Sequence, residues 1–296
     1  MIRVKVPAST SNLGPGFDSI GMALDSYLEI EAEVSRDWQF NHRSELLHDL
    51  PADDTHYLAR MVNHFCRLLK VEPFKLTVTM TSTIPLARGL GSSGTVLIAS
   101  LLIVNHVRQL KLSTDELIQL LSAEEGHPDN VVPSLLGGLV VGCHDGGQCY
   151  YEALAPIAWP MYAVIPDYEL KTADARNALP FELTYSSAVR ASAVSNVLVA
   201  ALSTGNYDLA GQMMMQDLLH EPYRKHLIKD YTELHDMLNG QGYAFLSGAG
   251  PTLFVMARPD ADIEQQLRER FLNCEVRRVN TDTAGAVCYA EVELSD

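Results

Sequence analysis

The amino-acid sequence predicts an α+β fold, because segments with strand-like alternation and segments with helical spacing both occur along the chain. The clearest predicted strand is Lys75 to Ile84, where apolar residues alternate with lysine and threonine as they do in a sheet with one face in water. The clearest predicted helix is the apolar segment Ser92 to Leu110. With 47% apolar residues in 296, the chain can build one large or two modest cores.

The elements of the first half follow from local patterns. Strands are predicted at Ile2 to Val6 and Leu28 to Val34, and a helix at Thr55 to Leu69. Between the first two strands, Pro7 to Asp18 is expected to form a loop. Beyond the strand and helix described above, another helix begins at Ser113, where Glu116 three residues later completes a capping box.

The second half begins with strands and ends with a mixed series. The predicted strands are Gly137 to Cys143 and Met161 to Ile165, and the predicted helices are Ser187 to Leu202, Tyr207 to Leu219 and Tyr231 to Leu238. The last elements are a hairpin, a helix and a strand: Tyr243 to Leu246, Thr252 to Ala257, Pro259 to Phe271 and Cys274 to Val279. This series resembles half of a ferredoxin-like unit. A domain boundary is expected near Pro156 to Tyr168.

Composition excludes some classes of partner. The chain has 22 Lys and Arg against 37 Asp and Glu, a net charge of −15, which disfavours nucleic acid and anionic membranes. The longest apolar run, Val96 to Val107, is too short to cross a bilayer, and the N-terminus lacks the pattern of a signal peptide. Five cysteines are scattered without metal-ligand spacing, which indicates reduced thiols and a cytoplasmic location.

A glycine-rich segment carries the strongest functional signal. Residues 85 to 94, Pro-Leu-Ala-Arg-Gly-Leu-Gly-Ser-Ser-Gly, join the clearest strand to the clearest helix. Glycines allow positive φ and a close approach of the backbone to a ligand, and the N–H groups at a helix N-terminus attract phosphate. The segment lacks the Gly-Lys-Ser/Thr ending of a Walker A loop and the spacing of a dinucleotide fingerprint. A purely structural helix-entry turn is the alternative.

Three other segments combine polar side chains with turn residues. They are Pro7-Ala-Ser-Thr-Ser-Asn-Leu-Gly-Pro-Gly-Phe-Asp18, Glu125-Gly-His-Pro-Asp-Asn130 and Leu246-Ser-Gly-Ala-Gly-Pro-Thr252. Each has an ordinary structural interpretation: a turn, a solvated helix end with a structural histidine, and a tight hairpin. Their joint occurrence with the glycine-rich segment weakens all of these interpretations together.

The first, the glycine-rich and the last of these segments resemble, in this order and at these distances, the three signatures of the GHMP kinase superfamily. Within it, the form of the first segment and the Glu125 to Asn130 turn are similar to those of homoserine kinases. The resemblance covers nearly the whole chain. It implies an ATP-binding domain like ribosomal protein S5 domain 2 over residues 1–160, and a ferredoxin-like C-terminal domain over residues 161–296.

The resemblance also implies an activity: ATP- and Mg²⁺-dependent phosphorylation of the side-chain hydroxyl of L-homoserine, in threonine biosynthesis. Phosphoryl transfer depends on charge neutralisation and in-line positioning. The residues implied to surround the triphosphate are Pro85, Leu86, Ala87, Arg88, Gly89, Leu90, Gly91, Ser92, Ser93, Gly94 and Thr95. Ser93, in preference to Ser92, and Glu125 would hold the Mg²⁺, which selects oxygen ligands.

The implied substrate is a small zwitterion with a primary hydroxyl. The residues implied to contact or shape its site are Asn12, Asp18, His127, Asp129, Thr172, Arg176 and Arg224. The two arginines suit the carboxylate, because a guanidinium fork matches its geometry. Asp129 and Asn130 are the implied catalytic residues, and Tyr57 lies in a region that could reach the nucleotide.

Several alternatives remain at this point. Glu124 competes with Glu125 as the metal ligand, and Asp129 acts either as a base or only in positioning. Another kinase of the superfamily, acting on mevalonate, a sugar or a cytidylated polyol, is the nearer competitor, and a ligand-binding protein without turnover is the more distant one. The oligomeric state is open, with a homodimer among the alternatives.

Overall fold

The computed structural model describes residues 1–290 and arranges their strands in two β-sheets. The strands of the first sheet are β1 (Ile2–Asn12), β2 (Gly16–Ser35), β3 (Gln39–His42), β4 (Lys75–Ser82), β5 (Leu139–Asp145), β6 (Gln148–Leu154) and β11 (Val287–Ala290). Their order is β11-β1-β2-β4-β3, and β5 pairs with β2 and β6. Every pairing is antiparallel except that of β3 with β4.

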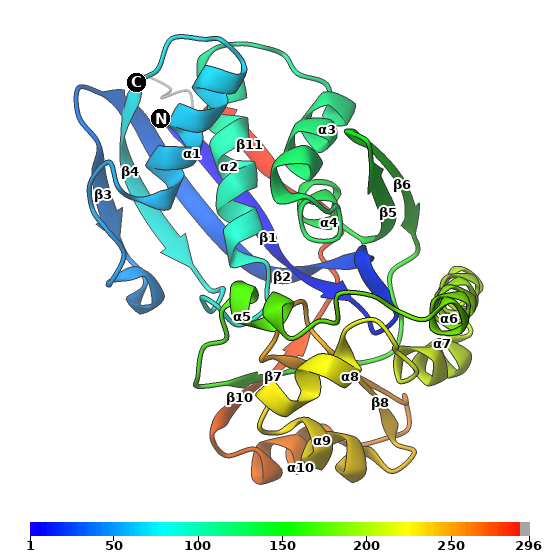
Figure 1. The fold of residues 1–296 in the computed structure, drawn as a ribbon. Coiled ribbons are helices and arrows are strands. Elements are labelled where there is room, and N and C mark those ends of the chain that lie inside the picture. Colours follow the sequence, from blue (N-terminus) through cyan, green and yellow to red (C-terminus); the bar gives the residue numbers. More distant parts are fainter. Residues whose placement is uncertain (291–296) are drawn as a thin grey trace.

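Helices cover one face of this sheet (Figure 1). They are α1 (Tyr57–Leu68), α2 (Ser92–Val107), α3 (Thr114–Glu125) and α4 (Val131–Leu136), and a 3₁₀ turn (Glu45–Leu47) precedes them. The predicted alternation in β4 is confirmed: Leu76, Val78 and Met80 are buried, whereas Lys75 and Thr77 are exposed. The predicted capping box is also confirmed at the start of α3.

The second sheet has the order β10-β7-β9-β8 and is antiparallel. Its strands are β7 (Met161–Pro166), β8 (Gly242–Leu246), β9 (Leu253–Ala257) and β10 (Cys274–Val279). The helices between β7 and β8 are α5 (Thr172–Asn177), α6 (Tyr185–Ser203), α7 (Tyr207–Met214), α8 (Glu221–Arg224) and α9 (Tyr231–Leu238), with a second 3₁₀ turn at Lys225–Leu227. Helix α10 (Glu264–Arg270) joins β9 to β10. This strand-helix-strand-strand-helix-strand order confirms the predicted ferredoxin-like unit.

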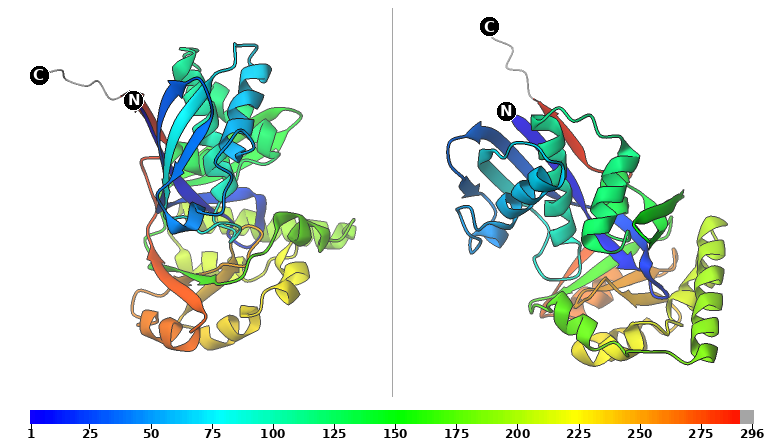
Figure 2. Two further views of the ribbon diagram at one scale, coloured as in Figure 1. Left: turned by 90° about the vertical axis from the view of Figure 1, so that its left-hand side faces the viewer. Right: turned by 45° about the horizontal axis from the view of Figure 1, so that its top comes forward.

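Strands β7, β8 and β9 of the second sheet are buried on both faces, which explains why they are apolar at almost every position. Along β9, Phe254 and Met256 belong to the large core shared with the first sheet, whereas Leu253 and Val255 pack in a smaller core with residues of α9 and α10. Alternate side chains of a strand point to opposite faces, so each face needs its own apolar set. The views in Figure 2 show the two sheets in contact and α6 and α7 extending beyond them.

The prediction of a loop at Pro7 to Asp18 is wrong. Most of it is paired strand: β1 continues to Asn12, and β2 begins at Gly16. Alanine, serine and threonine at positions 8 to 11 pair with Gly21 to Leu24 after a bulge at Pro7. Other segments pack closely on this hairpin, since a Cβ on Gly21 would lie 1.6 Å from the Asp129 carbonyl oxygen. This long hairpin carries the first signature segment to the site.

The C-terminal part of the described chain returns to the first sheet. Strand β7 opens the second sheet at Met161, but β11 pairs with β1. The boundary between residues 160 and 161 therefore stays a prediction. In the described part of the chain, no helix has the length and apolar character required to cross a bilayer. All five cysteines of the chain are free thiols.

Candidate functional site

Segments far apart in the sequence enclose one pocket of about 120 Å³. The predicted residues that line it are Asn12, Asp18, Ala87, Gly89, Leu90, Gly91, Ser92, Ser93, Gly94, Glu125, His127, Asp129, Asn130, Thr172, Arg176 and Arg224. The structure therefore places the residues predicted to bind nucleotide, metal and substrate around a single pocket. Its volume lies below the usual range for drug-sized ligands, about 300 to 1,000 Å³, and suits a small metabolite.

Four predicted residues lie outside the lining of this pocket: Pro85, Leu86, Arg88 and Thr95. The Arg88 side chain contacts the end of β7 and the residue after it. Its Nε donates to the Pro166 carbonyl oxygen at 3.0 Å, and its Nη2 donates to the Asp167 carbonyl oxygen at 2.7 Å. Arg88 thus fastens the glycine-rich segment to the end of β7.

Five residues of the lining were missed by sequence reasoning: Ser11, Phe17, Leu170, Gly248 and Ala249. Ser11 and Phe17 belong to the first signature segment and Gly248 and Ala249 to the last, so membership of a signature was the signal that could have found them. Leu170 has no such signal.

The glycine-rich segment leaves the N-terminus of α2 open toward the pocket. Gly89 and Gly91 have φ of 76° and 70°, and Gly91 precedes α2 without any side-chain cap on the helix. No side chain of residues 1–290 therefore caps the first N–H groups of α2, and the helix dipole adds positive potential there. A side chain would also clash here, because a Cβ on Gly89 would lie 2.3 Å from the Ser247 carbonyl oxygen.

Hydrogen bonds join the signature segments to one another. Ser247 Oγ donates to the Gly89 carbonyl oxygen at 2.7 Å and lies 2.8 Å from Thr10 Oγ1. Ser9 Oγ donates to Asn130 Oδ1 at 3.1 Å. These contacts link β1, the glycine-rich segment, the turn after α3 and the β8–β9 turn. Buried polar groups need such partners, so the network fixes the shape of the pocket.

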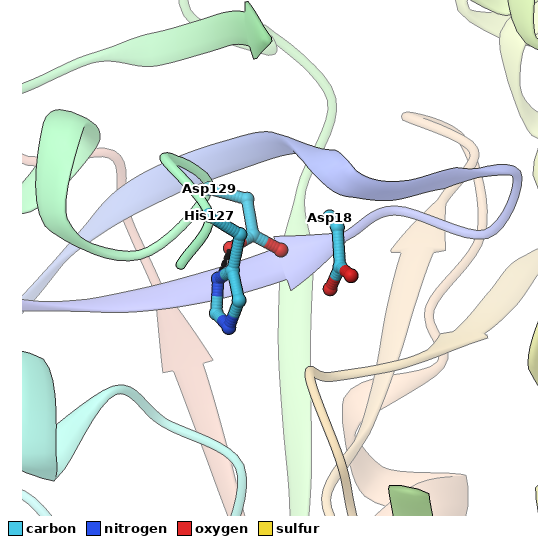
Figure 3. A group of neighbouring side chains, drawn as sticks. All are labelled: Asp18, His127 and Asp129. Carbon is cyan, nitrogen blue, oxygen red and sulfur yellow. Dashed lines mark hydrogen bonds and ion pairs between the residues drawn. The ribbon is translucent and has the colours of Figure 1, made fainter. Parts of the chain in front are cut away.

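A histidine and two carboxylates meet at one side of the pocket (Figure 3). One ligand atom from each of Asp18, His127 and Asp129 lies within 4.8 Å of the others. His127 Nδ1 is 2.5 Å from Asp129 Oδ1, which also accepts from Asn130 Nδ2 at 3.2 Å. Burial lowers the pKa of His127, but its hydrogen bond to Asp129 and the surrounding carboxylates raise it more, so the net pKa is above the ordinary value. The hydrogen bond to Asp129 thus favours the protonated form of the His127 imidazole.

The two predicted arginines lie on the other side. Arg176 donates to both oxygens of Asp18, at 2.9 and 3.1 Å, in a bidentate pair. Arg224 is 2% exposed and donates from Nε to Ala175 O and from Nη1 to Gly248 O, both at 3.1 Å. Burial first, and then the charge of Arg176, lowers the pKa of Arg224 to about 10, so it remains charged at neutral pH. Its Nη2 has no hydrogen-bond partner among residues 1–290.

Asn12 and Thr172 complete the substrate side. Asn12 has φ of 77°, accepts from the Asp18 N–H at 3.1 Å and donates to Gly248 O at 3.0 Å. Asn12 thus ties the Asp18 backbone to the β8–β9 turn. Thr172 begins α5 at the mouth of the pocket.

The structure distinguishes the two glutamates at the end of α3. Glu125 lines the pocket, and burial is the largest of the effects that raise its pKa. Glu124 lies outside the lining and is 2.8 Å from His64 Nε2. Ser93 lines the pocket as well, with its Oγ 3.4 Å from the Tyr57 hydroxyl. Glu125 and Ser93 thus supply oxygen atoms beside the open N-terminus of α2, which is the donor chemistry that Mg²⁺ selects.

A second cavity, of about 300 Å³, adjoins the first and shares Ser92 and Ser93 with it. Leucines, Met80 and Val96 give it an apolar wall, and Tyr57 lies at its edge. A planar apolar group fits such a space. The predicted residues Leu86 and Thr95 line this cavity.

Models of known families match both parts of the chain. The GHMP kinase N-terminal domain matches residues 56–138, and the GHMP kinase C-terminal model matches residues 198–273. The homoserine kinase of Staphylococcus saprophyticus is 42% identical over 96% of both chains. That of Bacillus velezensis is 40% identical over 97% of this chain and 94% of its own.

A solved structure agrees with these matches. The crystal structure of homoserine kinase from Cytophaga hutchinsonii superposes with a TM-score of 0.81 and 26% identity, over 97% of both chains. Sequence and fold agree over 96% or more of the chain, and one pocket joins the open N-terminus of α2 to paired arginines and carboxylates. The chain therefore belongs to the homoserine kinase family of the GHMP kinases.

Proposed function

We propose that this protein uses ATP to phosphorylate the side-chain hydroxyl of L-homoserine, forming O-phospho-L-homoserine for threonine biosynthesis in the cytoplasm. One observation carries the proposal: the uncapped N-terminus of α2 and the arginine and carboxylate groups face the same pocket. A phosphate donor and a zwitterionic acceptor can therefore lie side by side. The curated relatives named above support the same activity.

ATP would lie across both cavities. The adenine ring fits the apolar cavity beside Tyr57, and the triphosphate follows the glycine-rich segment to the N-terminus of α2. Backbone N–H groups then bind phosphate oxygens without a Walker lysine. Ser92 and Ser93 line both cavities and so mark the passage between them.

Glu125 and Ser93 would hold Mg²⁺. When bound, the ion neutralises charge that develops on the phosphoryl oxygens during transfer. The cluster of Asp18, His127 and Asp129 is a poorer Mg²⁺ site, because Arg176 already pairs with Asp18 and His127 already pairs with Asp129. It also offers an imidazole where Mg²⁺ prefers oxygen.

The acceptor would be oriented by charge at both ends. Its carboxylate would pair with Arg176 and with the unpartnered Nη2 of Arg224, and its ammonium with Asp18, which retains lone pairs beyond those that Arg176 uses. The side-chain hydroxyl would then face Asp129. Mevalonate lacks the ammonium and galactose lacks both charges, so each would leave charged groups unpaired.

In the reaction, the hydroxyl oxygen forms a bond to the γ-phosphorus as the bond between that phosphorus and the β–γ bridging oxygen breaks, and ADP leaves. Asp129 Oδ1 is already held by His127 and Asn130, so Oδ2 is the atom left to accept the hydroxyl proton. Asp129 would orient the hydroxyl and take its proton late, as the new oxygen–phosphorus bond acidifies it.

A coupled ADP-release assay tests the proposal with L-homoserine, mevalonate, galactose and L-threonine as acceptors. We expect turnover with L-homoserine that requires Mg²⁺, and strong rejection of mevalonate and galactose, because charged groups of the pocket left unpaired are unfavourable. Equal turnover of mevalonate would contradict the assignment of the acceptor but leave the kinase activity intact. ATP binding without turnover of any acceptor would instead indicate a binding protein.

A further inference from the structure

Phe17 contacts both arginines of the pocket, although no role was assigned to it. This half-buried residue lies at the start of β2 and lines the pocket. The guanidinium carbon of Arg224 is 5.1 Å from the centre of its ring, and that of Arg176 is 5.5 Å away. The His220 imidazole stacks on the same residue, with ring centres 5.1 Å apart and an interplanar angle of 19°.

The two guanidinium groups need such a neighbour because they repel each other. The charge of Arg176 is among the causes that lower the pKa of Arg224. Asp18 neutralises Arg176, but the hydrogen-bond partners of Arg224 are two carbonyl oxygens and an imidazole. The negative face of an aromatic ring attracts a cation without occupying its N–H groups. Phe17 can therefore hold both arginines and leave their donors available to a ligand.

His220 supports this arrangement without adding charge. It is fully buried, and burial is the main cause that lowers its pKa, so the ring is neutral. Nε2 donates to the Gly14 carbonyl oxygen at 2.9 Å, which leaves Nδ1 to accept from Arg224 Nη1 at 3.4 Å. Asp217 fixes the start of α8 by accepting from the His220 N–H at 2.9 Å. His220 thus connects the β1–β2 turn to Arg224 one helical turn later.

We propose that Phe17, backed by the neutral His220, is a positioning residue that holds Arg176 and Arg224 as one carboxylate-binding pair. The inference rests on the proposed function, in which these arginines bind the acceptor carboxylate. Phe17 itself touches neither the phosphate donor nor the reacting hydroxyl. Its loss should therefore weaken acceptor binding and spare the chemical step.

Steady-state kinetics of Phe17→Leu and Phe17→Tyr test the proposal. Leucine fills similar space without a ring face, and we expect it to raise the homoserine KM by about five- to thirty-fold, the effect of removing a partly desolvated cation–π contact. The KM for ATP should stay constant, and kcat should change by less than about twofold. Phe17→Tyr, which keeps the ring, should remain close to the wild type. Thermal melts check that each variant is folded.

Fluorinated phenylalanines at position 17 separate the ring's charge distribution from its shape. Each ring fluorine weakens the negative face at nearly constant volume, so the homoserine KM should rise with the number of fluorines. Arg176→Ala serves as the reference. If Arg176→Ala raises the homoserine KM while Phe17→Leu and the fluorinated series do not, the role of Phe17 is refuted and the proposed function stands. If Arg176→Ala leaves that KM unchanged, the carboxylate site is misplaced and the role of Phe17 falls with it, whereas the activity itself is tested separately by the ADP-release assay.

Discussion

Replacing Glu221 with glutamine should change how the stability of the protein depends on pH. Glu221 is 3% exposed and lies at the start of α8. Its Oε1 accepts from the Leu246 N–H at 2.8 Å and its Oε2 from the Tyr231 hydroxyl at 2.7 Å. Glutamine can keep both contacts, because its oxygen accepts from Leu246 and its NH₂ group donates to the tyrosine oxygen. The substitution therefore removes the ionisation and leaves the packing.

The magnitude follows from the pKa of Glu221. Burial is the largest cause that raises this pKa, from 4.5 to about 7. Below pH 4.5 the carboxyl is protonated in both the folded and the unfolded protein, and stability is at its full value. As the pH rises toward 7, the unfolded chain ionises first, and stability is lost. At ~1.36 kcal/mol per pH unit the whole loss is about 3 kcal/mol, of which about 2 kcal/mol falls between pH 5 and pH 7.

Urea unfolding of the wild type and Glu221→Gln at pH 5 and pH 7 measures this difference. The free energy of unfolding of the variant should gain about 2 kcal/mol relative to the wild type across that interval. Glu152→Gln, at an exposed position on β6, is the matched control and should follow the wild type. A pH dependence of Glu221→Gln equal to that of the wild type would refute the reasoning, because it would mean that Glu221 ionises normally inside the fold.

Two further predictions concern the phosphate and metal side of the pocket. Glu125→Gln should raise the Mg²⁺ concentration for half-maximal activity roughly tenfold or more, since it removes a charged ligand. Glu124→Gln, which lies outside the pocket lining, should change that concentration by less than about twofold. The reverse result in an Mg²⁺ titration would exchange the roles of the two glutamates. Gly91→Ala should raise the ATP KM and lower Tm by roughly 4 to 8 °C, because the residue has φ of 70° and a Cβ would lie 2.3 Å from Ser9 Oγ. Gly94→Ala, whose nearest contact would be 3.6 Å, is the control; equal effects of both substitutions on Tm and ATP KM would contradict the steric argument.

Elements that carry their own local signal were predicted from the sequence. The alternation in β4 and the capping box of Ser113 and Glu116 depend on neighbours a few residues apart, and both are confirmed. The fold class and the family followed from the signature segments, because glycines and polar residues at fixed spacing reflect a ligand-binding backbone. Most of the candidate site residues indeed line one pocket, although their individual roles remain proposals.

Features that depend on distant partners needed the tertiary structure. Residues 8 to 11 resemble a loop locally, yet they form strand because Gly21 to Leu24 pair with them. Arg88 is predicted beside the phosphates, and only the structure shows that its Nε and Nη2 donate to the carbonyl oxygens of Pro166 and Asp167. Phe17, His220 and Glu221 gain their importance only from burial and from contacts with the arginines and the β8–β9 region. Local patterns report how a segment folds on itself, whereas burial and charge pairing are properties of segments brought together, and these decided the geometry of the pocket.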